Sequence, residues 1–207
     1  LEPRFTIMSD GIDHSFQKNW HKYDMTYGAT VGMNYRLKAW KPFGKMRILE
    51  GNHFLDNTFI GIAAGGQFQA SRLTSEMGLT NSIGPHISLS AGKWLIPAFG
   101  LRLSAFKSAD TWHKKVIASS VSSAGEEFYE MSAYAGGRLE GMLDATYFFN
   151  GRQLSPKFSV NVLAGGELGY IQKENGYRPA KGGYTGFTGG LQFKYRLWGD
   201  VSLFAEP

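Results

Sequence analysis

Residues 157–170 read Lys-Phe-Ser-Val-Asn-Val-Leu-Ala-Gly-Gly-Glu-Leu-Gly-Tyr, and this stretch decides the fold. One set of alternate positions is apolar, aromatic or small, and it consists of Phe158, Val160, Val162, Ala164, Gly166, Leu168 and Tyr170. The other set includes Ser159, Asn161, Gly165 and Glu167. A period of two residues is typical of a β-strand that lies between an apolar and a polar environment. Lipid is the simplest solvent for an aliphatic face that is flanked by aromatic residues, so the stretch predicts a strand of an outer-membrane β-barrel.

Nine stretches alternate in this way, and we expect strands at about 1–9, 23–38, 57–70, 85–94, 99–107, 131–149, 157–172, 185–197 and 200–207. Most connections alternate in length: 95–98, 150–156 and 198–199 are short, whereas 10–22, 71–84, 108–130 and 173–184 are long. Short turns on the periplasmic side and long loops on the other side are typical of these barrels. The chain is therefore predicted to be all-β, as a transmembrane antiparallel up-and-down β-barrel with almost no helix.

The ends of the chain and one connection suggest a segment of a longer barrel chain. The opening residues Leu1-Glu2-Pro3-Arg4 do not read as a signal peptide, and the last alternating residues lack the terminal aromatic that is common in outer-membrane barrels. Single-chain bacterial barrels have even strand numbers, so nine stretches predict that at least one strand is missing. Residues 39–56 are long and basic where a short turn is expected. We treat 1–207 as one outer-membrane β-barrel domain with a repeat-unit junction near 39–56.

Weak internal repetition fits such a junction. Residues 27–37 resemble residues 187–197 and share the ending Tyr-Arg-Leu, and Leu1-Glu2-Pro3 resembles Ala205-Glu206-Pro207. The general similarity of barrel strands explains these matches equally well.

Composition excludes several classes of protein. The 207 residues include no Cys, so disulfides and thiolate metal sites are absent. The net charge of +5 is mild and scattered, which gives little support for nucleic-acid binding. No run of about 18 apolar residues occurs, which excludes a transmembrane helix but not a barrel.

The inward face is predicted to carry a lumen charge network. In a narrow barrel such side chains form ion pairs across the lumen and plug it, and in a wide one they line a water-filled path. Glu140 and Asp144 share a face and are conceivable as an acid–base pair, but a structural network is the better interpretation. The predicted network consists of Asp24, Arg36, Arg102, Arg138, Glu140, Asp144, Glu167, Lys194 and Arg196.

The outward face is predicted to meet lipid and to end in an aromatic girdle near the short turns. The girdle consists of Trp94, Phe99, Tyr147, Phe149, Phe158, Tyr195 and Trp198. The lipid-facing set is Ile87, Leu89, Ala91, Leu101, Leu103, Leu139, Leu143, Val160, Val162, Leu191 and Phe193. On this assignment an arginine is expected to be costly at Val162 and better tolerated at Asn161.

The remaining candidate sites give no enzyme, cofactor or metal. The five histidines, which are His14, His21, His53, His86 and His113, have no metal-ligand spacing. Residues 111–115 (Thr-Trp-His-Lys-Lys) are predicted to be a solvated loop that could contact lipopolysaccharide phosphate. The glycines of 182–186 lead into a strand and not into a helix, so they do not form a phosphate-binding loop. A phospholipase-like barrel would need a Ser and a His together on one outward rim, and we find no such placement.

Three sets of residues carry a resemblance to a known family. They are 90–94 (Ser-Ala-Gly-Lys-Trp) followed by Pro97 and 100–103 (Gly-Leu-Arg-Leu), then 143–150 (Leu-Asp-Ala-Thr-Tyr-Phe-Phe-Asn), then 203–207 (Leu-Phe-Ala-Glu-Pro). Over about residues 54–207 the chain resembles outer-membrane β-barrel proteins of Bacteroidota, the OmpA-like barrel family. The resemblance implies a location in the bacterial outer membrane and membership of envelope complexes. Proteins of this group can carry a periplasmic peptidoglycan-binding domain, but these residues match none.

We therefore expect a structural or assembly component of the bacterial outer membrane within a multi-protein envelope complex. Its partners would be outer-membrane lipids, lipopolysaccharide and other outer-membrane or periplasmic proteins, and not nucleic acid. One alternative is a small general porin, which needs a wider barrel and one sign of charge at its constriction. The other is a soluble lipocalin-type ligand-binding barrel, in which the apolar face points inward.

Overall fold

The computed structural model describes residues 4–9, 23–37, 54–70, 83–115, 127–149, 157–173 and 182–206. For residues 4–9, 23–25, 69–70, 110–115, 127–132, 171–173 and 182 it describes the backbone alone. The strands are β1 (Arg4–Ser9), β2 (Tyr23–Arg36), β3 (Thr58–Ala70), β4 (Gly84–Ile96), β5 (Phe99–Lys115), β6 (Glu127–Asp144), β7 (Phe158–Lys173), β8 (Gly182–Trp198) and β9 (Val201–Glu206). The short helix α2 (Ala145–Phe149) follows β6.

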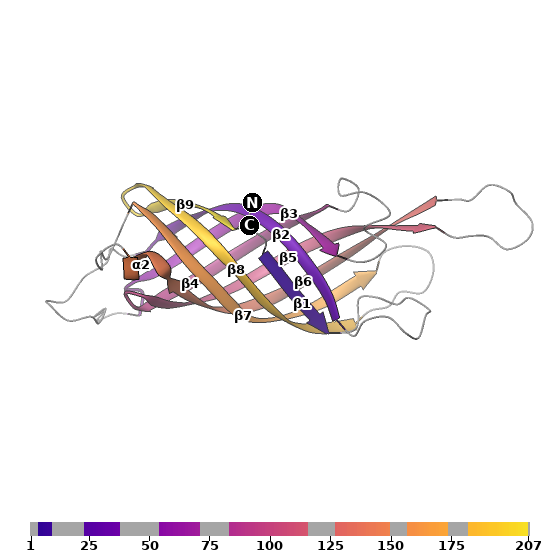
Figure 1. Ribbon diagram of the computed structural model, residues 1–207, viewed down its shortest axis with the longest axis horizontal. Helices are drawn as coiled ribbons and strands as arrows, with labels where there is room; N and C mark the ends of the chain where they lie inside the picture. The colour runs from indigo at the N-terminus through magenta and orange to yellow at the C-terminus, as the bar shows by residue number, and fades with distance from the viewer. Residues whose placement is uncertain are drawn as a thin grey trace, which may run out of the picture.

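Each strand pairs antiparallel with the next in the sequence, and two further pairings close the sheet into a barrel (Figure 1). These pairings join β1 to β8 and β2 to β9. Both β1 and β9 therefore lie between β2 and β8, end to end, and the nine strands occupy eight positions around the barrel. The predicted all-β antiparallel barrel is confirmed. The sheet closes with an even number of positions, so the odd count of stretches gives no support for a missing strand.

The β5–β6 hairpin is longer than the sequence predicts. Strand β5 continues to Lys115 instead of ending near 107, and β6 begins at Glu127 instead of 131. Residues 111–115, which we expected in a loop, are paired with 127–131 in this hairpin, so that prediction is wrong.

The end of the predicted strand 131–149 is also wrong, because residues 145–149 form α2. The Tyr147 amide donates to Asp144 Oδ1 at 3.2 Å, as expected for an acidic residue at a helix start. The Val160 amide donates to Thr146 Oγ1 at 2.6 Å, which attaches the helix to β7. No helix in the described part of the chain is both long enough and apolar enough to cross a membrane.

Tight turns at one end of the barrel set the alternation of the strands. Pro97 and Ala98 connect β4 to β5, and Gly199 and Asp200 connect β8 to β9. Gly199 has a φ of 49°, in the left-handed region that glycine occupies without a steric penalty. Because these turns fix the register of their hairpins, they decide which residues point into the barrel.

The interior is packed by two apolar clusters separated by polar side chains. One cluster consists of Phe59, Trp94, Met142 and Leu163, and the other of Phe106, Tyr134 and Tyr184. Inward glycines leave room for these rings. A Cβ at Gly92 would lie 2.3 Å from the Phe59 ring, and one at Gly169 would lie 2.3 Å from the Tyr184 ring. An eight-position barrel is just wide enough to be filled by side chains, which is what these clusters do.

Candidate functional site: a filled bore inside an apolar outer wall

The outer wall of the barrel is apolar over most of its described surface. Val31 on β2 and Leu103 on β5 are 64% and 61% exposed. Soluble monomers rarely expose a continuous apolar surface larger than a few hundred square ångströms, so a wall of this kind requires an apolar environment or a partner. The other large outward residues that are exposed include Ile60, Ile62, Ile87, Leu89, Leu101, Leu139, Leu143, Val162, Leu168, Phe187 and Leu203.

Aromatic residues gather on the outside near the short turns, as Phe99, Phe158, Tyr195 and Trp198 are all exposed. On α2, the rings of Tyr147 and Phe148 pack edge to face at 5.8 Å, and Phe149 is 86% exposed. Most of the residues predicted as a girdle therefore lie on the outer surface or on α2. Trp94 does not.

Trp94 is only 5% exposed and points into the barrel, so its predicted place in the outer girdle is wrong. Along β4, Trp94 falls on the same alternate positions as His86 and Gly92, which are buried, and not on those of Ala91, which is exposed. Its ring packs against Phe59, Met142 and Leu163 and lies under the Lys194 ammonium, 5.4 Å from the ring centroid.

The centre of the bore holds an arginine between two carboxylates. Arg102 on β5 donates to Glu140 Oε2 from Nε at 2.9 Å and from Nη2 at 2.7 Å. It also forms an ion pair with Glu206 on β9. All three side chains are almost completely buried. Gln192 Nε2 donates to Glu206 Oε1 at 2.7 Å, and Asn161 Nδ2 donates to Gln192 Oε1 at 2.7 Å, so the network reaches β7 and β8.

Asn161 is part of this network and is completely buried. An arginine at Asn161 would therefore be overpacked, and the expectation that it is better tolerated there than at Val162 stays a prediction.

A second buried ion pair lies nearer the end of the barrel opposite the tight turns. Arg138 Nη2 lies 2.6 Å from Glu167 Oε2, and the Tyr184 hydroxyl donates to Glu167 Oε1 at 2.8 Å. The Arg138 guanidinium also lies over the Phe106 ring, 4.6 Å from its centroid. Cation–π contact and hydrogen bonding together satisfy this buried charge.

A smaller polar cluster lies beside this ion pair. His86 Nδ1 is hydrogen-bonded to Ser108, whose hydroxyl donates to Gln67 Oε1 at 3.1 Å. The His86 ring stacks on Phe106 at 5.7 Å. The three side chains come from β3, β4 and β5, and all are buried. A small cavity of about 20 Å³ adjoins His86, Gln67 and Arg138, which is room for about one water molecule.

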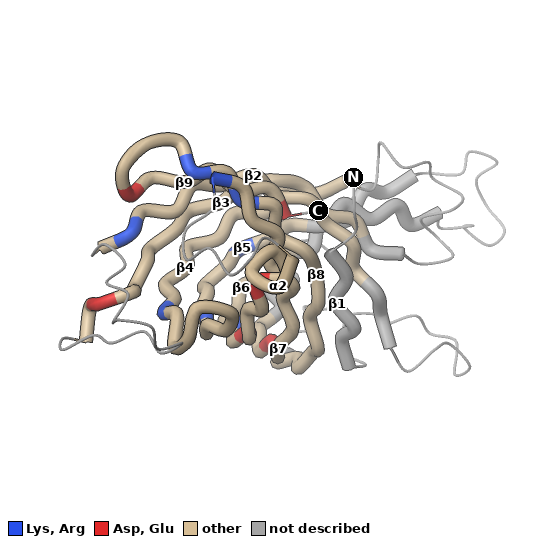
Figure 2. Tube along the Cα trace, turned by 60° about the vertical axis from the view of Figure 1, so that its left-hand side comes forward, with Lys and Arg blue, Asp and Glu red and all other residues tan. Residues whose placement is uncertain are grey.

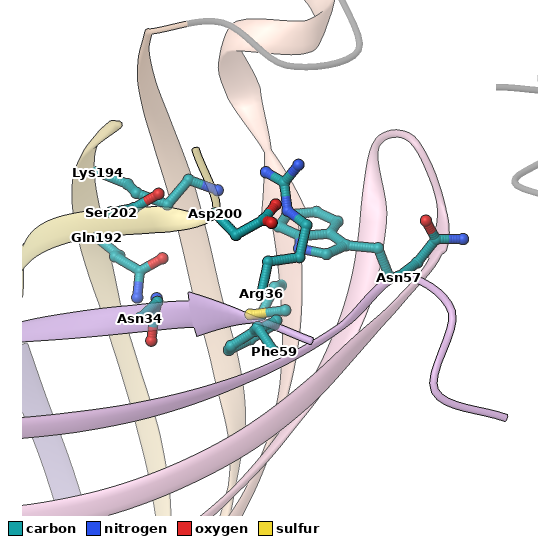
Figure 3. Close-up of a pocket in the computed structure, with 10 residues that line it drawn as sticks. Asn34, Arg36, Asn57, Phe59, Gln192, Lys194, Asp200 and Ser202 are labelled. Carbon is teal, nitrogen blue, oxygen red and sulfur yellow. The ribbon is translucent and has the colours of Figure 1, made fainter. Parts of the chain in front are cut away.

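Residues of β2, β3, β8 and β9 line a cavity at the tight-turn mouth of the barrel (Figure 3). The Arg36 amide donates to the Asp200 carbonyl at 2.9 Å, and the Asp200 carboxylate is the charge that most favours the Arg36 cation. The Asp144 carboxylate likewise is the charge that most favours the Lys194 cation. Both cations line a cavity of about 20 Å³. The buried Oδ1 atoms of Asn34 and Asn57, two further lining residues, accept no hydrogen bond within the described protein.

The repeated Tyr-Arg-Leu ends meet at this mouth. Strands β2 and β8 flank β9, with Tyr35 opposite Val201 and Tyr195 opposite Leu203. Both tyrosines are about half exposed. The next residues, Arg36 and Arg196, are close enough for their positive charges to repel each other. Figure 2 shows basic positions close together in this region of β2 and β9. The repetition thus places matching residues on either side of one strand.

Charges of both signs lie inside the described bore. The basic residues include Arg36, Arg102, Arg138, Lys194 and Arg196, and the acidic ones include Glu140, Asp144, Glu167, Asp200 and Glu206. Asp24 lies on β2 opposite Met8, where only the backbone is described. Glu206 and Asp200 also belong to the network, although they were not among the residues predicted for it. Glu206 falls on the same alternate positions of β9 as inward Ser202, whereas Leu203 and Ala205 point outward. That alternation could have identified Glu206 as an inward residue.

The pairing of these residues also differs from the expectation of contacts across the lumen. Arg102 and Glu140 are direct register partners on β5 and β6, and Arg138 and Glu167 are direct partners on β6 and β7. Of the three ion pairs Arg102–Glu140, Arg138–Glu167 and Arg102–Glu206, the last is the one that crosses the bore. Glu140 is occupied by Arg102 and does not act with Asp144 as an acid–base pair.

Among the described residues, no group of three or more His, Asp or Glu side chains is arranged to hold a metal ion. The chain matches no protein-family model, no curated protein and no solved structure.

Proposed function

We propose that this chain is a closed outer-membrane β-barrel that serves as a structural or assembly component of the bacterial outer membrane, within a multi-protein envelope complex. One observation carries the proposal: a filled bore with paired charges of both signs lies inside a wall whose outer surface is apolar. The outer wall would contact outer-membrane lipids and lipopolysaccharide, and the rims would contact envelope proteins. The role is not enzymatic.

The height of the apolar wall supports the lipid environment. On β7 the outward residues from Phe158 to Tyr170 are all apolar or glycine. Twelve steps of about 3.3 Å give about 40 Å along the strand, and a tilt of about 40° reduces this to about 30 Å along the barrel axis. The hydrocarbon core of a bilayer is about 30 Å thick. Phe158, Tyr195 and Trp198 would then lie at the level of the headgroups.

The filled bore favours this role over a small general porin. A porin needs a continuous water-filled path, and pores usually have one sign of charge at the constriction. Here Arg102 and Arg138 are each bound by carboxylates, and the cavities at Asn34 and at His86 hold about 20 Å³ each. A soluble lipocalin-type barrel would have its apolar face inside, which is the reverse of the arrangement at Val162 and Asn161.

The envelope complex and the longer parent chain belong to the same proposal. They rest on the resemblance of residues 54–207 to the OmpA-like barrels of Bacteroidota, whose members belong to envelope assemblies.

Membrane fractionation, bilayer conductance and co-purification test the proposal. The chain, expressed with an export signal in a Gram-negative host, should float with outer-membrane vesicles in a density gradient and resist extraction by carbonate. The protein purified in detergent should give no steady channels of porin size in planar bilayers. When a tagged copy is expressed in its own organism, envelope proteins should co-purify with it. Recovery in the carbonate extract would refute the membrane location, and steady channels of porin size would refute the closed role.

A further inference from the structure

Three basic side chains converge at the tight-turn mouth of the barrel. Lys194 and Arg196 are alternate residues of β8, and Arg36 is the last residue of β2. The three lie close enough to act on one another, because Arg36 and Arg196 both repel the Lys194 ammonium. Arg36 and Lys194 line the same cavity (Figure 3). Like charges that lie this close together create a positive potential, which attracts an anion.

Two carboxylates lie near these cations, and each has another role. The Asp200 carboxylate is the charge that most favours the Arg36 cation. The Asp144 carboxylate accepts a hydrogen bond from the Tyr147 amide, and from Thr146, at the start of α2. The three cations and two carboxylates together carry one positive charge in excess.

The Lys194 ammonium is the cation that lacks an acceptor. Among the residues that the structure describes, none accepts a hydrogen bond from this ammonium or forms a close ion pair with it. Its contact is with the face of the Trp94 ring, whose centroid lies 5.4 Å away. An ammonium has three N–H donors, and leaving donors without acceptors at a half-buried position is costly. An anionic acceptor would remove this cost.

The space beside these cations fits one end of a carboxylate group. The cavity holds about 20 Å³, which is room for about one water-sized group, so one carboxylate oxygen can enter it. Phe59, Trp94 and Met142 also line the cavity and are buried. Apolar side chains keep water away and thereby strengthen charge interactions. A carboxylate brings one negative charge, which matches the excess at the mouth, whereas a phosphate group brings about two and is bulkier.

We propose that Arg36, Lys194 and Arg196 form a carboxylate-binding site at the tight-turn mouth of the barrel. One carboxylate oxygen accepts hydrogen bonds from the Lys194 ammonium inside the cavity, and the other faces the arginines at the rim. The ligand is either a free carboxylic acid or an acidic side chain of a partner protein. The site depends on the interior of the barrel and not on the membrane location.

Titration with sodium acetate tests the site in the full chain folded in detergent. The backbone amide NMR signals of Lys194 and Arg196 should shift and saturate, whereas sodium chloride at the same ionic strength should give no saturable shift. A tripeptide that is blocked at both ends and has a central glutamate is titrated in parallel. Tighter binding of the peptide than of acetate identifies a protein carboxylate as the ligand, and equal or weaker binding of the peptide identifies a free acid.

Three variants separate the site from general charge effects. Lys194→Met should weaken acetate binding about tenfold, because a charge-assisted hydrogen bond is lost. Asp200→Asn should strengthen acetate binding, because it removes a negative charge that repels the ligand. Lys93→Met is the matched control, since Lys93 lies at the same end of the barrel but its ammonium donates to the Phe54 carbonyl at 2.8 Å. This variant should leave acetate binding unchanged.

Several outcomes would overturn the proposal. The site is refuted if acetate causes no saturable shift, if chloride acts as acetate does, or if Lys93→Met weakens binding as much as Lys194→Met. Tighter binding of inorganic phosphate than of acetate refutes the carboxylate as the ligand. If Lys194→Met does not fold, the test passes to Asp200→Asn, and unchanged or weaker acetate binding in that variant refutes the site.

Discussion

Replacing Arg102 by methionine should destabilise the barrel more than any other single charge removal in the bore. Arg102 binds two carboxylates, Glu140 and Glu206, and all three groups are almost completely buried. Removing one partner of a buried ion pair typically costs about 3–5 kcal/mol, because the remaining charge is left without a counterion. Arg102→Met leaves two such charges close together, so we expect a loss of unfolding free energy at the upper end of that range.

Two further variants separate charge from packing. In the triple variant Arg102→Met, Glu140→Gln and Glu206→Gln, no ionised group remains at the centre, so most of the lost stability should return. Arg196→Met removes the same functional group from a half-buried place at the mouth. There we expect about 1 kcal/mol or less, because partly solvated charges are screened.

The assay is equilibrium unfolding in urea of the protein folded in detergent micelles, followed by β-sheet circular dichroism. A loss of about 3–5 kcal/mol should lower the midpoint by about 1–5 M if the slope is near the usual value of about 1–3 kcal/mol per molar urea. The reasoning fails if Arg102→Met changes stability no more than Arg196→Met does. It also fails if the triple variant is as unstable as the single one, because packing and not charge would then be responsible.

Further predictions concern the two faces of the wall. In lipid vesicles, Val162→Arg should lower the free energy of unfolding by about 2–4 kcal/mol and Tyr195→Arg by about 0–1 kcal/mol. The reason is that the penalty for a charged side chain falls from the bilayer midplane to the interface. Equal unfolding free energies for the two variants would contradict the lipid-facing assignment. Gly169→Ala should cost about 1–3 kcal/mol in urea unfolding, since its Cβ would lie 2.3 Å from the Tyr184 ring. Gly183→Ala, whose nearest neighbour would be 3.7 Å away, should be nearly neutral, and similar losses for the two alanine variants would show that this contact is not limiting.

The sequence predicts the strands and their faces because both depend on local alternation. Val160 and Val162 point outward and Ser159 and Asn161 point inward, as a period of two requires. The same local information fails at the ends of strands. The extension of β5 to Lys115 depends on pairing with Glu127, a contact between residues that are distant in the sequence.

Trp94 shows a second limit of sequence reasoning. Composition places tryptophan at a membrane interface, and Trp94 does lie beside a short turn. The alternation along β4 nevertheless makes the Trp94 side chain point into the barrel, where inward Gly92 and Gly100 leave space around Phe59 and Met142. Only the set of inward residues on several strands, taken together, could have predicted that an aromatic ring fits there.

The partners of the buried charges depend on how the sheet closes. Arg102–Glu140 and Arg138–Glu167 follow from the register of adjacent strands, which local alternation restricts to steps of two residues but does not fix. The Arg102–Glu206 pair depends on more, because β5 and β9 are four strands apart in either direction around the sheet. They therefore face each other across the full width of the bore. Barrel diameter increases with strand number, so an added strand would separate this pair. The split position, in which β1 and β9 together count as one, is thus what keeps the barrel narrow enough for Arg102 to reach both carboxylates and close the bore.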